Sequence, residues 1–210
     1  MLFGGLFSTE KRQVMNAALD WISGISWSLV YVIAIIIGIR KKALGIPAVN
    51  ICLNICWESC VVIARVIGRS EFDSGFISQL LWLGLDIGLL CVFFKHANWL
   101  PVLKKLVYLG GAAISMVLCT WMLGLWAETA FAINLIMSIF FLWSNHKRVF
   151  SSLTIAVLKF VGTLSATILN GIIHQDYIIV ALGGLCFIAD ICYIIETVKC
   201  LRITELCEHE

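Results

Sequence analysis

The chain has 210 residues, of which 61% are hydrophobic and only 13% are charged, and its mean hydropathy is +0.99. Because an ordinary soluble domain carries about 25% charged residues, this composition indicates an integral membrane protein. The net charge of +2 is too small to indicate a nucleic-acid partner. With two prolines and no long polar linker, the chain is predicted to form a single compact domain.

Residues 1–20 mix apolar and charged side chains and lack the small-residue cleavage site of a signal peptide, so we expect them to lie at the membrane interface. Seven apolar segments follow, each close to the ~20 residues needed to span a bilayer. The sequence therefore predicts an all-α integral membrane protein, with a seven-helix transmembrane bundle over residues 21–197 and a tail over residues 198–210. The expected spans are Trp21–Ile39, Ile46–Ile67, Phe76–Phe94, Leu106–Leu123, Ala127–Trp143, Leu153–Ile173 and Tyr177–Thr197.

The lysines and arginines of the connecting segments predict the orientation, because positively charged short loops stay in the cytoplasm. The side that includes the C-terminus carries ten of them, and the side that includes the N-terminus carries four, Lys11, Arg12, Arg65 and Arg69. We therefore expect the N-terminus outside or in a lumen and the C-terminus in the cytoplasm. The membrane is expected to be the endoplasmic reticulum in a eukaryote or the cell membrane in a bacterium.

Glu58 lies near the middle of the second apolar segment, where an acid costs roughly 3 kcal/mol and commonly marks a functional site. Asn54 precedes it by four residues and Arg65 follows it by seven, so all three share one face of a helix. We expect this polar face to look into the protein interior.

Five other apolar segments each carry a similar set of residues along one predicted helix face, which we call a stripe. One such stripe per apolar helix predicts a bundle with a polar-lined central cavity. The stripes are Trp27, Ser28 and Tyr31 in the first span, Gln79, Trp82 and Asp86 in the third, Asn134, Ser138 and Phe141 in the fifth, Lys159, Thr163 and Asn170 in the sixth, and Gly183, Cys186, Asp190 and Tyr193 in the seventh.

Familiar metal and phosphate motifs are absent from the sequence, including DDxxD, HExxH, a Gly-rich phosphate loop and GxSxG. Seven of the nine cysteines lie inside apolar segments without paired CxxC spacing, which is typical of small packing residues. We therefore expect neither a metal nor another cofactor.

Three acids, Glu58, Asp86 and Asp190, are expected to lie at comparable depth and to face one cavity. Burial disfavours the charged form of a carboxyl, so at least one should be protonated at neutral pH and able to protonate an epoxide or an alkene. Asp86 or Asp190 pairing with Lys159 is the simpler alternative, with the aromatic side chains as ordinary core. In the catalytic interpretation, aromatic rings would stabilise the resulting carbocation: Trp27, Tyr31, Trp57, Trp82, Phe187 and Tyr193.

Five segments together resemble the small membrane-bound terpene cyclases of fungal meroterpenoid and indole-diterpene biosynthesis, in the same order over about Trp21–Glu196. They are GIPAVNICLNICWES (Gly45–Ser59), LWLGLD (Leu81–Asp86), NLIMSIFF (Asn134–Phe141), SLTIAVLKFVGTL (Ser152–Leu164) and GLCFIADICY (Gly184–Tyr193).

The resemblance implies a metal-independent enzyme that cyclises a prenylated, usually epoxidised substrate by protonation. It implies that Glu58 and Asp190 are the two catalytic acids. It also places Asp86, Asn134 and Lys159 at positions that shape the pocket, donate hydrogen bonds or form structural pairs. The short chain, short loops and cysteine-rich second span depart from the family pattern, so an epoxide and an unoxidised prenyl chain both remain open as the group that is protonated.

A small seven-helix carrier of the PQ-loop or sugar-efflux type is the alternative, since it has a similar length, span number and N-terminal orientation. Such carriers bend their helices at Pro-Gln motifs, whereas Pro47 opens a predicted helix here and Pro101 lies in a predicted loop. A retinal protein is disfavoured because the last span has no lysine, and Lys159 belongs to the sixth.

Overall fold

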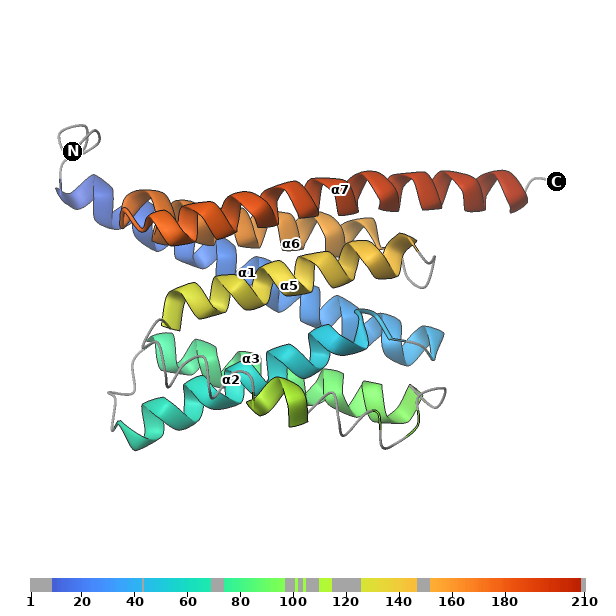
Figure 1. Cartoon of the computed structure of the whole chain (residues 1–210), viewed down its shortest axis with the longest axis horizontal. Coiled ribbons are helices and arrows are strands. Elements are labelled where there is room, and N and C mark those ends of the chain that lie inside the picture. Colours follow the sequence, from blue (N-terminus) through green and yellow to red (C-terminus); the bar gives the residue numbers. More distant parts are fainter. Residues whose placement is uncertain are drawn as a thin grey trace.

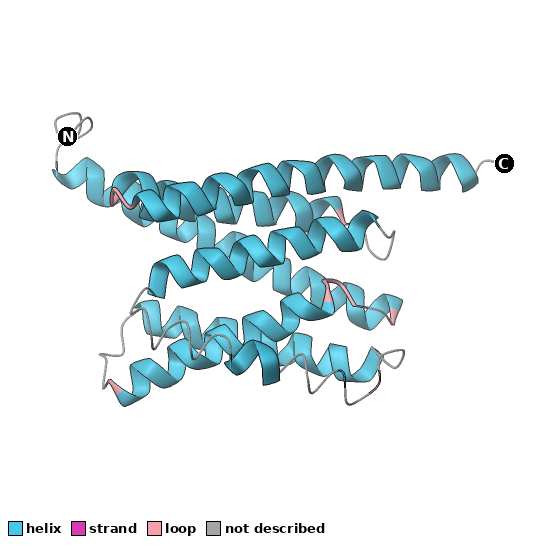
Figure 2. Cartoon of the chain, viewed as in Figure 1, coloured by secondary structure: helices cyan, strands magenta, loops and turns pink. Residues whose placement is uncertain are grey.

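The structure is a computed structural model that describes residues 9–42, 44–68, 74–96, 101, 104, 110–114, 126–146 and 152–208. Within these ranges every regular element is helical (Figure 2). The elements are α1 (Thr9–Lys41), α2 (Ala48–Ile67), α3 (Ser74–His96), α5 (Trp126–His146), α6 (Leu153–Ala166), the π-helix η1 (Thr167–Ile173) and α7 (Tyr177–Glu208).

Six helices of the described chain are long and apolar enough to cross a membrane, counting α6 and η1 as one. They correspond to the first, second, third, fifth, sixth and seventh predicted spans. Most of the fourth predicted span, Leu106–Leu123, lies outside the described residues. The part of it that is described, residues 110–114, is helical. Large apolar side chains are exposed on the outer surface, including Trp21, Ile67 and Tyr177. Such a surface suits contact with lipid rather than water, so the fold is that of a multi-pass membrane protein.

The first and last helices are longer than their predicted spans. α1 begins at Thr9 rather than at Trp21, and α7 continues to Glu208 rather than ending at Thr197. Neither extension contains glycine or proline, the two residues that most disfavour a helix interior. The first and last helices therefore include residues 9–20 of the expected interfacial segment and residues 198–208 of the expected tail. α2, in contrast, starts directly after Pro47, as predicted.

The helices are arranged with α7 at one edge of the bundle and with α2 and α3 at the opposite edge (Figure 1). α1 packs on α6 and α3, and α2 packs on α3 and α5, whereas α7 packs on α5, α6 and η1. α5 and α6 consequently separate α7 from the edge that α2 and α3 form. This order decides which of the predicted stripes meet.

The main apolar core lies in the half of the bundle where α1 ends. Six helices contribute fully buried or nearly buried side chains to it, among them Ala34, Ile51, Phe93 and Ile155. The other half, where α1 begins, contains the cavity described below.

Two glycines allow close approach of helices. At Gly162 of α6, a Cβ atom would lie 2.9 Å from Cδ1 of Trp27 and 3.2 Å from Cβ of Ser26, both on α1. At Gly183 of α7, a Cβ atom would lie less than 3 Å from the side chain of Thr167. Small residues at these contacts are typical of packed membrane helices.

We expect Gly162→Ala to destabilise the protein by about 1–3 kcal/mol, because the added methyl group forces the Trp27 ring or the whole of α6 to move. Gly84→Ala on α3 is the matched control, since a Cβ there meets nothing within 4 Å. That change should be neutral or stabilising by up to ~1 kcal/mol through helix propensity. Thermal unfolding in detergent measures both variants. Equal stability of the two would contradict the close α1–α6 contact.

Candidate functional site

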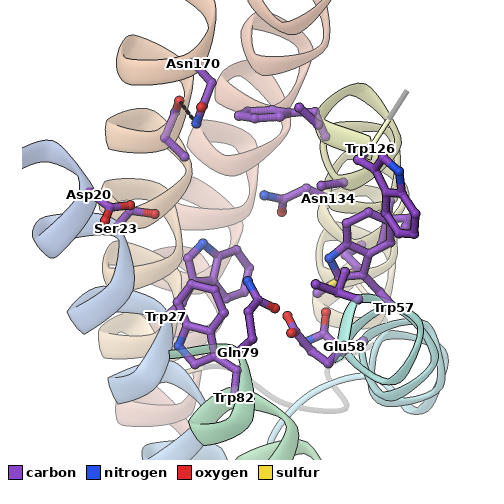
Figure 3. Close-up of a pocket in the computed structure, with 18 of the residues that line it drawn as sticks. Asp20, Ser23, Trp27, Trp57, Glu58, Gln79, Trp82, Trp126, Asn134 and Asn170 are labelled. Atoms are coloured by element: carbon purple, nitrogen blue, oxygen red, sulfur yellow. Dashed lines mark hydrogen bonds between the residues drawn. The ribbon is translucent and has the colours of Figure 1, made fainter. Parts of the chain in front are cut away.

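A cavity of about 900 Å³ lies among α1, α2, α3, α5 and the α6–η1 helix. Its polar lining residues are distributed over all five helices, and six aromatic side chains form much of the remaining wall (Figure 3). The polar residues are Asp20, Ser23, Asn54, Glu58, Arg65, Gln79, Asn134 and Asn170, and the aromatic ones are Trp27, Tyr31, Trp57, Trp82, Trp126 and Phe131.

The cavity is deep along the bundle axis. On α1 its lining runs from Asp20 to Tyr31, and on α2 it runs from Arg65 to Asn54. Each stretch covers eleven helical steps, or ~16 Å at ~1.5 Å per residue. Asp20 and Arg65 therefore lie at one end of the cavity, in the half where α1 begins, and the Tyr31–Asn54 level lies near the middle of the bundle.

The aromatic wall is held in place by its own contacts. The Trp27 and Tyr31 rings lie 6.0 Å apart between centroids, and the Trp57 and Trp126 rings lie 5.9 Å apart. Trp82 Nε1 donates a 3.0 Å hydrogen bond to Oγ of Ser28. In Figure 3, Trp27 and Trp82 lie on one side of the cavity and Trp57 and Trp126 on the other. The two sides face a space that suits an apolar ligand.

Glu58 projects into this space from the middle of α2. Its side chain points toward Gln79 across the cavity (Figure 3). Glu58 is 5% exposed, and its Oε2 atom has no hydrogen-bond partner among the described residues. Oε1 of Gln79 likewise has no partner there. Buried polar atoms are normally satisfied, so two such atoms facing one cavity mark a place where a ligand or water binds.

Behind Glu58, Asn54 and Tyr31 form the inner end of the cavity. Asn54 Nδ2 donates a 2.5 Å hydrogen bond to the Tyr31 hydroxyl oxygen. Asp86 of α3 is fully buried and interacts electrostatically with both Tyr31 and Glu58. Asn54 lies beside Asp86 as well, yet neither carboxyl oxygen of Asp86 has a partner with hydrogen-bonding geometry in the described chain.

Asp190 and Asp86 do not line the cavity with Glu58, and this corrects the expectation that the three acids face one space. Lys159 Nζ donates to Asp190 Oδ1 at 2.5 Å and to Ser138 Oγ at 2.6 Å, and the pair is sealed from solvent. The Lys159 ammonium also lies 5.8 Å from the centre of the Trp27 ring and 5.6 Å from that of Phe141. The simpler alternative, an aspartate paired with Lys159, therefore holds for Asp190.

Phe187 and Tyr193 also lie away from the cavity, although they were expected in its wall. Phe187 is 42% exposed and packs on Phe160, whereas Tyr193 is buried against Phe141. The reason is the position of α7 behind α5 and α6. The predicted inner face of this helix is nevertheless confirmed, since Gly183, Cys186, Asp190 and Tyr193 are all buried.

Asp86 was expected in the pocket as well, but it is fully buried and is not one of the residues that line the cavity. The remaining predicted pocket residues line it, namely Asn54, Trp57, Trp82, Trp27, Tyr31 and Asn134. Asn134 Nδ2 donates to Thr163 Oγ1 at 3.4 Å, and its Oδ1 atom has no partner among the described residues. Trp126 was missed because it directly precedes the predicted fifth span at Ala127. A tryptophan at the end of an apolar segment signals the membrane interface, but not which way its ring turns.

Metal ligands are not clustered in the described part of the chain, where no three His, Cys, Asp or Glu side chains are grouped to hold an ion. Cys56 and Cys60 pack against Ile133 and Met137 of α5, which is the packing role expected for them.

No protein-family model, curated protein or solved structure matches this chain. The cavity and the side chains around it are therefore the basis for assigning a function.

Proposed function

We propose that the protein is a metal-independent terpene cyclase in which Glu58 protonates an epoxide or alkene of a prenylated substrate. The observation that carries the proposal is a buried carboxyl with an unsatisfied oxygen inside a cavity walled by four tryptophans. A protonated carboxyl held against a weakly basic group of the substrate can act as the general acid that starts a carbocation cascade. The resemblance of five sequence segments to membrane-bound cyclases supports the same reaction.

The dimensions of the cavity suit this substrate class. A volume of about 900 Å³ lies within the range of ~300–1,000 Å³ that is typical of small-molecule sites. Each tryptophan or tyrosine face stabilises a nearby cation by ~0.5–2 kcal/mol. The walls formed by Trp27, Trp57, Trp82 and Trp126 would therefore stabilise positive charge wherever it moves along the chain of the substrate.

Asp190 keeps a part in the proposal as a positioning residue. An aspartate that pairs with an ammonium as a carboxylate has no proton to donate. Lys159 in turn lies beside the Trp27 ring, which lines the cavity. Asp190 therefore acts through Lys159 on the shape and electrostatics of the aromatic wall.

The proposed topology has seven spans, with the N-terminus outside or lumenal and the C-terminus cytoplasmic. The charge bias of the connecting segments supports the orientation. α3 and α5 run in the same direction along the bundle (Figure 1), which supports a further crossing between His96 and Trp126. The substrate would then partition from the lipid bilayer of the endoplasmic reticulum or of a bacterial cell membrane.

Membranes containing the protein should convert an epoxidised or plain prenylated aromatic compound into a cyclic isomer of unchanged mass. Chromatography with mass spectrometry measures this conversion, and membranes without the protein are the control. If no prenylated compound is isomerised while a polar solute shows counterflow across vesicles, the protein is a carrier and the proposal fails.

A further inference from the structure

Asp86 is a second buried acid that the proposed reaction has not yet used. The exposed fraction of the residue is 0% for Asp86, as it is for Asp190. Asp190, however, has the ammonium of Lys159 at 2.5 Å, whereas both oxygens of Asp86 lack a hydrogen-bond partner in the described chain. Burying an ionised carboxylate without such compensation costs several kcal/mol. We therefore expect Asp86 to hold a proton in the resting protein.

Asp86 is coupled to the carboxyl that faces the cavity. α3 packs on α2, and Asp86 interacts electrostatically with Glu58. Two buried carboxyls that interact in this way resist ionising together, so the pair retains at least one proton.

Tyr31 connects the pair to the cavity. It lines the cavity and interacts electrostatically with both carboxyls. Its oxygen accepts the hydrogen bond from Asn54, which leaves the hydroxyl proton available for donation to a carboxylate.

We propose that Asp86 is the proton store of Glu58, and that the two carboxyls with Tyr31 form one proton-handling unit at the inner end of the cavity. The catalytic part of this inference rests on the proposed cyclase function. The Glu58 O–H bond breaks as its proton forms a bond to the epoxide oxygen or alkene carbon. Asp86 then passes its proton to the Glu58 carboxylate by way of the Tyr31 hydroxyl.

The cycle closes when the cyclised cation loses a proton to form its final double bond. Tyr31, which lines the cavity, accepts that proton as its own hydroxyl proton moves to the Asp86 carboxylate. No proton is gained or lost overall, so substrate and product are isomers, and no oxidant or reductant is needed.

Infrared spectroscopy of the purified protein tests the unit without any substrate, because a protonated carboxyl has a carbonyl stretching band that a carboxylate lacks. We expect Glu58→Gln and Asp86→Asn each to remove one such band and to shift the band of the remaining acid. Asp190→Asn is the comparison, since that carboxyl is paired with Lys159 and should not move either band. Cys91→Ser, at an exposed position of α3, controls for effects of substitution in that helix.

Turnover provides the second measurement. Asp86→Asn should slow cyclisation by about 100-fold, a typical loss for a proton-handling group, whereas Cys91→Ser should retain full turnover. If Asp86→Asn does not fold, Tyr31→Phe replaces it, and it should shift the same bands and slow the same step.

The two measurements separate the inference from the proposed function. Shifted bands together with slow turnover support both. Shifted bands in a protein that cyclises nothing support the carboxyl unit and overturn the cyclase. Unshifted bands, or normal turnover in Asp86→Asn, overturn the role of Asp86 whatever the protein does.

Discussion

Glu58→Gln is expected to lose at least ~100-fold in turnover while substrate still binds. Gln has nearly the shape of Glu, but its amide has no acidic proton, so the variant lacks the general acid and keeps the wall of the cavity. The loss should appear in kcat with little change in KM, because proton transfer takes place in the transition state. Initial rates over a range of substrate concentrations measure both constants.

Glu196→Gln is the matched control for this experiment. It is the same chemical change in α7, on a side chain that binds Lys199 at 2.7 Å near the surface and does not line the cavity. Its kcat should equal that of the wild type. Full activity in Glu58→Gln would remove Glu58 from the mechanism, and equal losses in both variants would show a general effect on folding.

Lys159→Met is expected to cause the largest loss of stability, about 3–5 kcal/mol. Removing one partner of a buried ion pair leaves the other charge without compensation. Here the remaining carboxylate of Asp190 would be fully buried with no ammonium beside it. Thermal or denaturant unfolding in detergent measures the loss.

Replacing both partners tests the physical reason for that loss. The double variant Lys159→Met with Asp190→Leu should recover most of the stability, because two apolar side chains of similar volume avoid the cost of burying charge. Lys199→Met breaks an exposed pair and should leave unfolding unchanged. If Lys159→Met were as stable as the wild type, the buried pair could not be an important part of the fold.

The sequence alone was sufficient for the properties that are local to one helix. An apolar run of about twenty residues predicts a membrane helix wherever it lies, and six such runs are helices in the described chain. The spacing of polar residues also predicts which side of each helix turns inward. Glu58, Asp86, Lys159 and Asp190 are accordingly all buried. Both properties depend only on the 3.6-residue period and on the cost of exposing polar groups to lipid.

Which inward faces meet was decided by the tertiary structure. A stripe determines how a helix is rotated about its own axis, but it contains no information about the neighbours of that helix. Contacts distant in sequence, such as Gly162 against Trp27 and Gly183 against Thr167, accompany the packing of α1 on α6 and of η1 on α7. That packing places α7 behind α5 and α6.

The consequence is a division among acids that look equivalent in the sequence. Asp190 pairs with Lys159 away from the cavity, whereas Asp86 interacts electrostatically with Glu58 and Tyr31, which line the cavity. The buried ammonium of Lys159 compensates one aspartate, and the geometry of the bundle determines which one. Asp86 keeps its carboxyl beside Glu58 because its helix, α3, packs on α2.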